Sequence, residues 1–177
     1  MSGADLNSIA RRSREMGLSF RVMSDNDLPF LEDLYASTRE DELALAPWSD
    51  AEKQEFIKMQ FHAQHTHYQK HYPDALWLVI ELADKLIGRL YLERWKSEHR
   101  IIDIAIITKK RGQGLGKAVL LDLMDEAAEV DKAIGIHVEK NNQAMELYHR
   151  LGFKTIEDKG VYDLLKWQKG NQPNTAS

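Results

Sequence analysis

A glycine-rich loop between an apolar segment and a helical pattern constrains the fold more than any other feature of the chain. The loop is Arg-Gly-Gln-Gly-Leu-Gly-Lys, residues 111–117. Apolar residues 101–107 precede it, and apolar side chains recur at helical spacing over residues 115–129. Strand, glycine loop and helix in this order form an anion site, because glycines permit close approach and a helix N-terminus offers free N–H groups. The sequence therefore predicts a phosphate or pyrophosphate ligand, with Arg111 and Lys117 adding positive charge.

Two common phosphate-binding motifs do not fit this loop. A Walker A motif would need its first glycine at Arg111 and its magnesium-binding hydroxyl at Ala118. The dinucleotide-binding motif would need its third glycine at Lys117 or at Val119. The pattern that remains is Arg-x-x-Gly-x-Gly, formed by Arg111, Gly114 and Gly116.

The remaining pattern resembles the pyrophosphate-binding loop of the GNAT-type N-acetyltransferase superfamily, and the resemblance implies acetyl-CoA as co-substrate. In that superfamily the strand before the loop splays from the next strand, and the pantetheine amides bond to the backbone groups left unpaired. The cofactor-binding residues implied here are Ile106, Ile107, Arg111, Gly112, Gln113, Gly114, Leu115, Gly116 and Lys117. Residue type alone fits an ordinary buried strand equally well at Ile106 and Ile107.

A second segment, residues 138–153, resembles the superfamily pattern Val-Glu-x-x-Asn-x-x-Ala-x-x-x-Tyr-x-x-x-Gly-Phe. The spacing from Val138 to Tyr148 is one residue shorter than in many members. Counting from the two ends therefore gives either Asn141 or Asn142 as the matching asparagine. In the superfamily that asparagine helps to hold the pantetheine arm, and the tyrosine lies near the thioester sulfur.

Tyr148 is the candidate for the catalytic acid. A phenol with a pKa near 10 can donate a proton to a departing thiolate with a pKa near 8.5. The alternative is an aromatic side chain that only packs against the sheet. The chain has no cysteine, which excludes a cysteine-based acyl-enzyme. We therefore expect direct acetyl transfer or a weaker nucleophile.

The base that deprotonates the acceptor amine is less well defined by the sequence. Asp103 is the candidate, either as the base or as an acid that orients the substrate, because it interrupts an otherwise apolar strand. Glu93, Glu139 or a water held by one of these acids are alternatives. A carboxylate in such a strand is costly to bury unless it is paired, so Asp103 could instead be the structural partner of Arg89 or Arg100.

The other segments predict one mixed, mostly antiparallel sheet flanked by helices, an α/β (α+β) fold. Strands are expected at residues 18–23, 75–82, 86–95, 101–107, 133–138, 153–158 and 161–167. Helices are expected after the caps at Ser24 and Ser49, and at residues 115–129 and 141–151. The resulting order, β-α-α-β-β-β-α-β-α-β-β, is also that of the GNAT fold.

Length and composition indicate one soluble globular domain. The chain has 177 residues, of which 43% are hydrophobic and 29% charged. We expect the domain to cover residues 18–168. Residues 1–17 are predicted to form a flexible arm or a short fraying helix, and residues 169–177 a disordered tail.

The remaining bulk properties argue against several partners. The net charge of −4 gives no reason to expect a nucleic acid. No apolar run approaches the roughly 20 residues of a membrane span. The polar N-terminus lacks a signal-type apolar core, so a cytoplasmic location is expected.

Two groups of polar side chains have plain structural explanations. One group lies at the end of the second helix, where no acid or cysteine completes a metal site, so we expect a solvated helix end and no metal. Its members are His62, His65, His67 and His71. The other group is predicted to be the solvent-facing side of the helix after the glycine loop. Its members are Asp122, Asp125, Glu126 and Glu129.

Two hypotheses about function follow. The first is an N-acetyltransferase that moves an acetyl group from acetyl-CoA directly to a primary amine of a small molecule or peptide. The second is a module of the same fold that binds CoA or acyl-CoA without catalysis, as a sensor or interaction domain. The oligomeric state stays open, although dimers are common in the superfamily and a homodimer is compatible with the resemblance.

Overall fold

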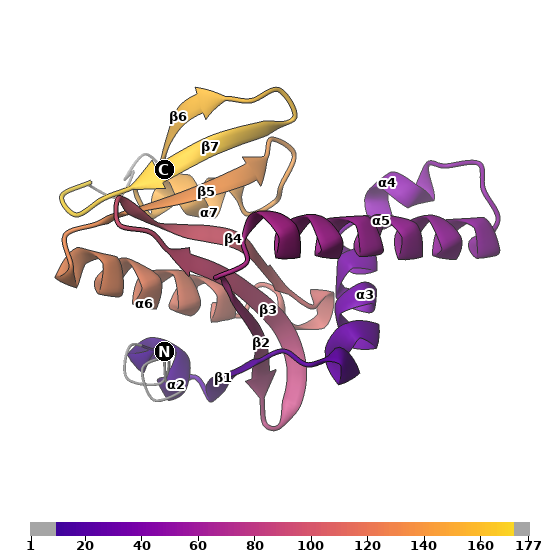
Figure 1. Cartoon of the computed structure of the whole chain (residues 1–177), viewed down its shortest axis with the longest axis horizontal. Coiled ribbons are helices and arrows are strands. Elements are labelled where there is room, and N and C mark those ends of the chain that lie inside the picture. The colour runs from indigo at the N-terminus through magenta and orange to yellow at the C-terminus, as the bar shows by residue number, and fades with distance from the viewer. Residues whose placement is uncertain (1–9, 172–177) are drawn as a thin grey trace.

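The computed structural model describes residues 10–171, which form one seven-stranded sheet with helices on both faces (Figure 1). The strand order is β1-β2-β3-β4-β5-β7-β6. The strands are β1 (Leu18–Val22), β2 (Leu76–Leu82), β3 (Lys85–Arg94), β4 (Glu98–Ile106), β5 (Ala133–Glu139), β6 (Lys154–Asp158) and β7 (Tyr162–Trp167). Only β4 and β5 pair in parallel within this sheet, so the prediction of a mixed, mostly antiparallel sheet is confirmed.

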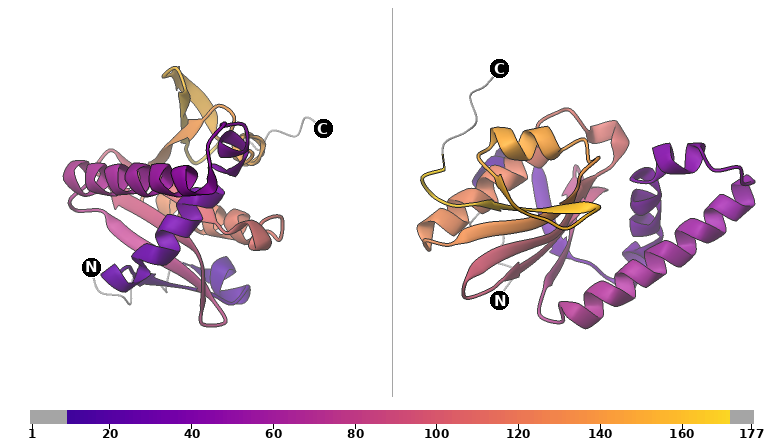
Figure 2. Two further views of the ribbon diagram at one scale, coloured as in Figure 1. Left: turned by 90° about the vertical axis from the view of Figure 1, so that its right-hand side faces the viewer. Right: turned by 90° about the horizontal axis from the view of Figure 1, so that it is seen from above.

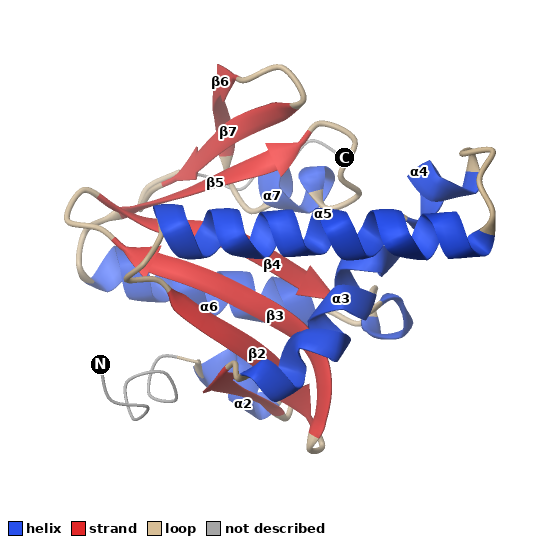
Figure 3. Ribbon diagram, turned by 45° about the vertical axis from the view of Figure 1, so that its right-hand side comes forward, coloured by secondary structure: helices blue, strands red, loops and turns tan. Residues whose placement is uncertain are grey.

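The helices cover the two faces of the sheet unequally (Figure 3). The helices are α2 (Arg11–Glu15), α3 (Leu28–Ser37), α4 (Glu40–Ala44), α5 (Asp50–His71), α6 (Leu115–Glu129) and α7 (Met145–Arg150). Short 3-10 turns precede α3 and α6, at Asp25–Asp27 and Thr108–Lys110. The larger core lies between the sheet and α6 with α7, and a smaller core lies between α3, α5 and the opposite face. No helix within residues 10–171 is long and apolar enough to cross a lipid bilayer.

The long helix α5 defines one side of the molecule. It begins with the predicted capping box, in which the Ser49 hydroxyl accepts from the Glu52 N–H and the Glu52 carboxylate accepts from the Ser49 N–H. Ile57 and Phe61 are its buried residues. The N-terminal part of α5 extends beyond the sheet, where α4 lies close to it (Figures 1 and 2).

The prediction that the acidic residues of α6 face solvent is wrong for two of them. Asp122 is 4% exposed and Glu126 is 9% exposed. Asp122 accepts hydrogen bonds from the N–H of Arg12 (3.0 Å), the N–H of Ser13 (2.9 Å) and the hydroxyl of Ser13 (2.7 Å). The carboxylate thus satisfies the free N–H groups at the start of α2, although 109 residues separate it from Ser13. A buried carboxylate is stable only with a partner, and a helical-spacing argument misses this one because it lies far away in the sequence.

Several element boundaries differ from those predicted. Strand β4 begins at Glu98, where a turn was predicted, because its first residues pair in parallel with β5. Helix α7 begins at Met145 rather than near Asn141, after an irregular turn. Residues 11–15 form a short helix, one of the two arrangements predicted for the N-terminal arm. The rest of that arm before residue 10, and residues 172–177 of the predicted tail, lie outside the described residues.

Candidate active site

The parallel strands β4 and β5 diverge towards their C-terminal ends (Figure 3). Their pairing ends at Ile101↔Ile136, although β4 continues to Ile106 and β5 to Glu139. A register shift between β3 and β4 leaves Ile102 without a partner, which is a β-bulge at the point of divergence. Residues 102–105 are half-buried, although β4 is a central strand. The edge of β4 that faces β5 therefore has unpaired backbone beyond Ile101.

The glycine loop lies directly after this unpaired edge. Gly114 has φ of 82° and is the N-cap of α6, a left-handed conformation that a side chain with a Cβ adopts only with strain. A Cβ on Gly112 or Gly116 would meet nothing within 4 Å, and one on Gly114 would meet only the methyl group of Met16 at 3.9 Å. The first turn of α6 therefore opens onto free space, as an anion-binding helix terminus requires.

The guanidinium group of Arg111 forms hydrogen bonds within the protein. Its Nε donates to the carbonyl oxygen of Ile106 at 2.9 Å, and a terminal guanidinium nitrogen lies 3.5 Å from the hydroxyl of Ser37. Both backbone groups of Ile107 are also used, since its N–H donates to Ile87 and its carbonyl accepts from Lys110. Of the two isoleucines predicted to contact the cofactor, Ile107 thus has no free backbone group, and the carbonyl of Ile106 is shielded by Arg111.

Tyr148 has features expected of a packing residue and features expected of a catalytic acid. The side chain is 3% exposed and packs edge-to-face on Phe153, with ring centroids 5.5 Å apart. Its hydroxyl has no hydrogen-bond partner among the described residues, whereas a buried tyrosine hydroxyl usually finds one. Burial, and then the negative charge of Asp103, raise the pKa of Tyr148 above its ordinary value. The phenol is therefore protonated at neutral pH.

Asp103 is ion-paired with Arg89, the structural partner that the sequence suggested as an alternative. The Asp103 side chain keeps 21% of its surface exposed, whereas that of Arg89 keeps only 4%. Arg89 also donates to the side chain of Gln64 on α5 at 3.0 Å, and its guanidinium carbon lies 4.9 Å from the ring centroid of Tyr91. The nearby Tyr68 has its pKa raised by burial and then by Asp103. Asp103 is thus a fixed carboxylate on the face covered by α5.

The two other candidate acids lie elsewhere on this face. Glu139, at the end of β5, forms an ion pair with Arg39 at 2.9 Å and accepts from the Tyr162 hydroxyl at 3.4 Å. Glu93 lies on β3 opposite Arg100, before the point of divergence. Asp103 is therefore the only one of the three that lies on the unpaired part of β4.

The two candidate asparagines differ in their local bonding. The Asn142 side-chain oxygen accepts from the N–H of Ala144 at 2.8 Å and so caps the turn before α7. The Asn141 side chain is exposed and has no hydrogen bond within residues 10–171. Asn141 is therefore the one whose amide is available to a ligand.

One polar pair near the divergence was not singled out from the sequence. Arg100 on β4 reaches across to His137 on β5, with 3.1 Å between a guanidinium nitrogen and Nδ1. His137 is exposed and lies on the same side of β5 as Gly135 and Glu139, opposite the side of the buried Ile136 and Val138. A polar residue on the outward side of an alternating strand is ordinary, so the sequence gave no signal for this pair.

The histidines of α5 do not form a metal site. No group of three or more His, Asp or Glu side chains within residues 10–171 is arranged to hold a metal ion. His67 and His71 stack on each other with ring centroids 4.1 Å apart, and His65 stacks on Phe61 at 5.9 Å.

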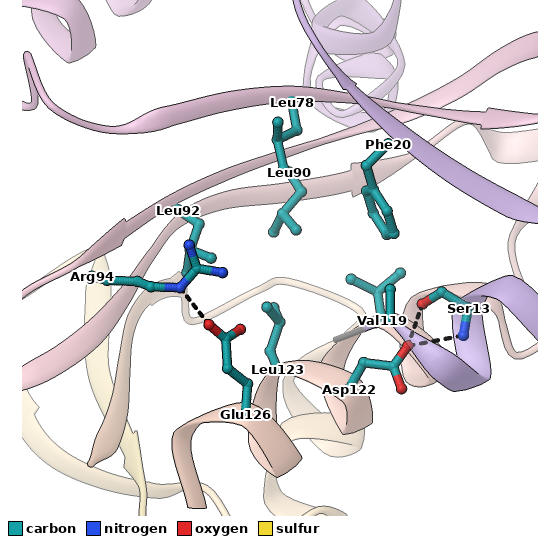
Figure 4. A pocket seen from close by; sticks show the side chains of 11 residues that line it. Ser13, Phe20, Leu78, Leu90, Leu92, Arg94, Val119, Asp122, Leu123 and Glu126 are labelled. Carbon is teal, nitrogen blue, oxygen red and sulfur yellow. Dashed lines mark hydrogen bonds and ion pairs between the residues drawn. The ribbon is translucent and has the colours of Figure 1, made fainter. Parts of the chain in front are cut away.

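A small apolar pocket lies on the opposite face, between α2, α6 and the sheet (Figure 4). Leu90, Leu92 and Val119 line it, and the Ser13–Asp122 and Arg94–Glu126 pairs border it. It is separate from the glycine loop and from the diverging strands.

Known structures share this fold. An N-acetyltransferase PaiA from Thermoplasma acidophilum in complex with coenzyme A superposes with a TM-score of 0.65, at 17% identity, over 86% of this chain and 99% of that one. The protein PH1933 from Pyrococcus horikoshii gives 0.64 at 21% identity, over 86% and 98%. Arabidopsis thaliana Naa50, in complex with the bisubstrate analogue CoA-Ac-MVNAL, gives 0.53 at 19% identity, over 86% and 99%. At such low sequence identity, these structural similarities establish the fold alone.

Sequence comparison identifies the family. The sequence has no significant match among curated proteins. Residues 30–153 match the model of the acetyltransferase (GNAT) family, a span that includes the glycine loop, the diverging strands and Tyr148. The resemblance noted in the glycine loop and in residues 138–153 is thereby confirmed. The chain belongs to the acetyltransferase (GNAT) family.

Proposed function

We propose that this acetyltransferase moves an acetyl group from acetyl-CoA directly to the primary amine of a small molecule or peptide. One observation carries the proposal: the glycine loop at the start of α6 and the unpaired edge of β4 adjoin each other, and the free hydroxyl of Tyr148 belongs to the core beside them. A pyrophosphate, a pantetheine arm and a thioester sulfur need these three features in this order.

The chain's residues would hold coenzyme A in two ways. Backbone N–H groups of residues 112–117 would bind the pyrophosphate, together with Arg111 once its guanidinium leaves the carbonyl of Ile106. The pantetheine amides would bond to β4 before Ile106 and to the amide of Asn141, with Asn142 shaping the turn. Ile107 would contribute side-chain contacts, since its backbone groups are used.

In the proposed acetyl transfer, Tyr148 and Asp103 have separate roles. Coenzyme A supplies an activated acetyl thioester. The acceptor nitrogen forms the new N–C bond as the C–S bond breaks, and Tyr148 donates its proton to the departing sulfur. Asp103 orients the amine and, through water, takes the proton that the nitrogen loses. Unpaired backbone N–H groups of β4 polarise the carbonyl oxygen.

Peptides are one class of molecule that can supply the acceptor amine. Naa50 was crystallised with an acetylated peptide joined to CoA, which supports peptides as one class of acceptor for this fold. The rival function, a non-catalytic module that binds CoA, is favoured by one observation, because Asp103 is already engaged in an ion pair with Arg89.

Detection of free thiol from acetyl-CoA separates the two functions. The protein is incubated with acetyl-CoA alone and then with a panel of alkyl amines, amino amides and short peptides. Acetyltransfer predicts thiol release that depends on the amine and falls strongly in Tyr148→Phe. Binding of acetyl-CoA without amine-dependent release from any member of the panel would support the non-catalytic module.

A further inference from the structure

His137 lies at the vertex where β4 and β5 part. It is the first residue of β5 beyond the last β4 pair, Ile101↔Ile136. Alternate residues of a strand share a face, so His137 points to the same side of the sheet as Glu139. Glu139 contacts Arg39, which follows α3, and Asp103 connects through Arg89 to Gln64 on α5. His137 and Asp103 thus lie on one face, on opposite sides of the divergence.

Arg100 fixes which nitrogen of His137 carries the proton. A guanidinium can only donate hydrogen bonds, so the Nδ1 of His137, 3.1 Å from Arg100, must accept. The hydrogen of the neutral ring therefore sits on Nε2. Arg100 cannot turn away easily, because it is 8% exposed, pairs with Glu98 at 3.1 Å and lies 4.7 Å from the ring centroid of Trp95.

The surroundings keep this ring neutral. Arg100 and Glu98 on β4 face it, and so do Glu157 and Lys159 of the β6–β7 hairpin. Although the side chain is exposed, its partial loss of solvent, followed by the positive charges of Arg100 and Lys159, lowers the pKa of His137 below its ordinary value. At pH 7 the exposed Nε2–H is therefore a neutral hydrogen-bond donor of fixed direction.

We infer that His137 is a positioning residue whose Nε2–H donates to an oxygen adjoining the acceptor amine, so that the acceptor class is an α-amino amide or peptide N-terminus. The inference rests on the proposed acetyltransferase function. An α-amine carries a carbonyl oxygen next to the nucleophilic nitrogen, so Asp103 on β4 can hold the nitrogen while His137 on β5 holds the oxygen. A plain alkyl amine offers nothing to the Nε2–H group and leaves it unpaired in the complex.

The test compares alaninamide with isopropylamine, in which a methyl group replaces the carboxamide group of alaninamide. The value of kcat/KM is determined for each at pH 8 and expressed per unprotonated amine. We expect alaninamide to be preferred at least fivefold, the effect of one neutral hydrogen bond of about 1 kcal/mol. His137→Ala should lower this selectivity ratio about fivefold, and His137→Gln, which keeps an N–H donor, should restore most of it. A role in packing alone would not be rescued by glutamine.

A second measurement does not depend on catalysis. Ring-labelled nitrogen NMR of the full chain should show His137 with a protonated Nε2 and an unprotonated Nδ1. A proton on Nδ1, an equal kcat/KM for the two amines, or equal selectivity in wild type and His137→Ala would each overturn the inference alone. Acetylation of neither amine, with no thiol release across the wider panel, would overturn the proposed function and this inference with it.

Discussion

Tyr148 combines a buried ring with an unused hydroxyl. Its pKa is raised by burial and by Asp103, so the acid form persists at any pH at which the protein would be assayed. The side chain therefore holds its proton and cannot serve as a base at neutral pH, although the same rise in pKa makes the phenol a weaker acid towards a thiolate. Asp103 thus acts on Tyr148 through its charge.

Tyr148→Phe should separate chemistry from binding. The ring and its packing on Phe153 remain, and only the hydroxyl is lost. We expect kcat to fall by roughly 10²–10⁴, the usual contribution of general acid–base catalysis, and acetyl-CoA affinity to change far less. Steady-state kinetics and calorimetry measure the two effects. Tyr72→Phe, at the end of α5, is the matched control, and unchanged turnover in Tyr148→Phe would leave the tyrosine a packing residue.

The Asp103–Arg89 pair should show strong coupling in stability. Asp103→Asn leaves the charge of Arg89 buried without its partner, which costs about 3 kcal/mol in the free energy of unfolding. The double variant Asp103→Asn/Arg89→Met removes both charges and should recover much of this loss. Urea denaturation of the four proteins provides the cycle. Additive losses would mean that the two side chains do not stabilise each other.

Among the secondary-structure elements, helix α6 both borders the proposed pyrophosphate site and holds α2 in place. Its first turn opens onto the space proposed for the pyrophosphate, and its middle holds α2 through Asp122. The side chain of Met16, just after α2, also approaches Gly114 at the start of α6. One rigid helix thus carries the glycine loop and anchors the N-terminal segment.

Gly116→Ala should affect stability and cofactor binding in opposite directions. Alanine suits a helix better than glycine, and the new Cβ would meet no atom within 4 Å, so stability should rise by about 0.4–1 kcal/mol. The Cβ of a helical residue points towards the N-terminus, into the space proposed for the pyrophosphate, so acetyl-CoA affinity should fall. Thermal unfolding and calorimetry test both. Unchanged affinity would contradict the proposed cradle.

Asp122→Asn should loosen α2 without disturbing the sheet. The neutral amide accepts more weakly than a carboxylate from the N–H groups of Arg12 and Ser13, so we expect a loss of about 1–2 kcal/mol. Asp125→Asn is the control, because that side chain is 57% exposed and its pairing with Arg12 contributes little. Urea denaturation and amide exchange of residues 11–15 measure the difference. Equal effects in the two variants would contradict the capping role.

In the molecule as a whole, the two faces of the sheet differ in the kinds of side chain they carry. The larger core with α6 and α7 supplies the rigid framework and holds Tyr148. The face with α3 and α5 carries ionic and aromatic groups, among them Arg89, Asp103 and Arg39. In the proposed reaction both faces would act on one thioester at the divergence of β4 and β5.

Binding at this junction should stabilise the entire fold. Acetyl-CoA bound to the native state at about 100 times its dissociation constant should raise the free energy of unfolding by roughly 2.7 kcal/mol. ATP and NAD at the same concentration should give much smaller shifts in Tm, because neither carries a pantetheine arm for the unpaired β4 edge. A larger shift with ATP or NAD would contradict the assignment of the loop.

Local patterns were sufficient to predict the fold and the family, whereas the cofactor-binding residues remain predictions. The glycine loop, the capping box at Ser49 and the strand alternations each depend on neighbours in sequence, and local backbone preferences determine them directly. The mixed, mostly antiparallel sheet and the family followed from these signals.

Only the tertiary structure decided which polar side chains pair with one another. Asp103 pairs with Arg89 14 residues away, Arg100 with His137 37 residues away, and Asp122 with Ser13 109 residues away. Each contact joins different elements, and a charged side chain is stable inside a protein only where the packing brings it a partner. Periodicity indicates which face a residue prefers, but it contains no information about what lies on the facing element, so these pairings became visible only in three dimensions.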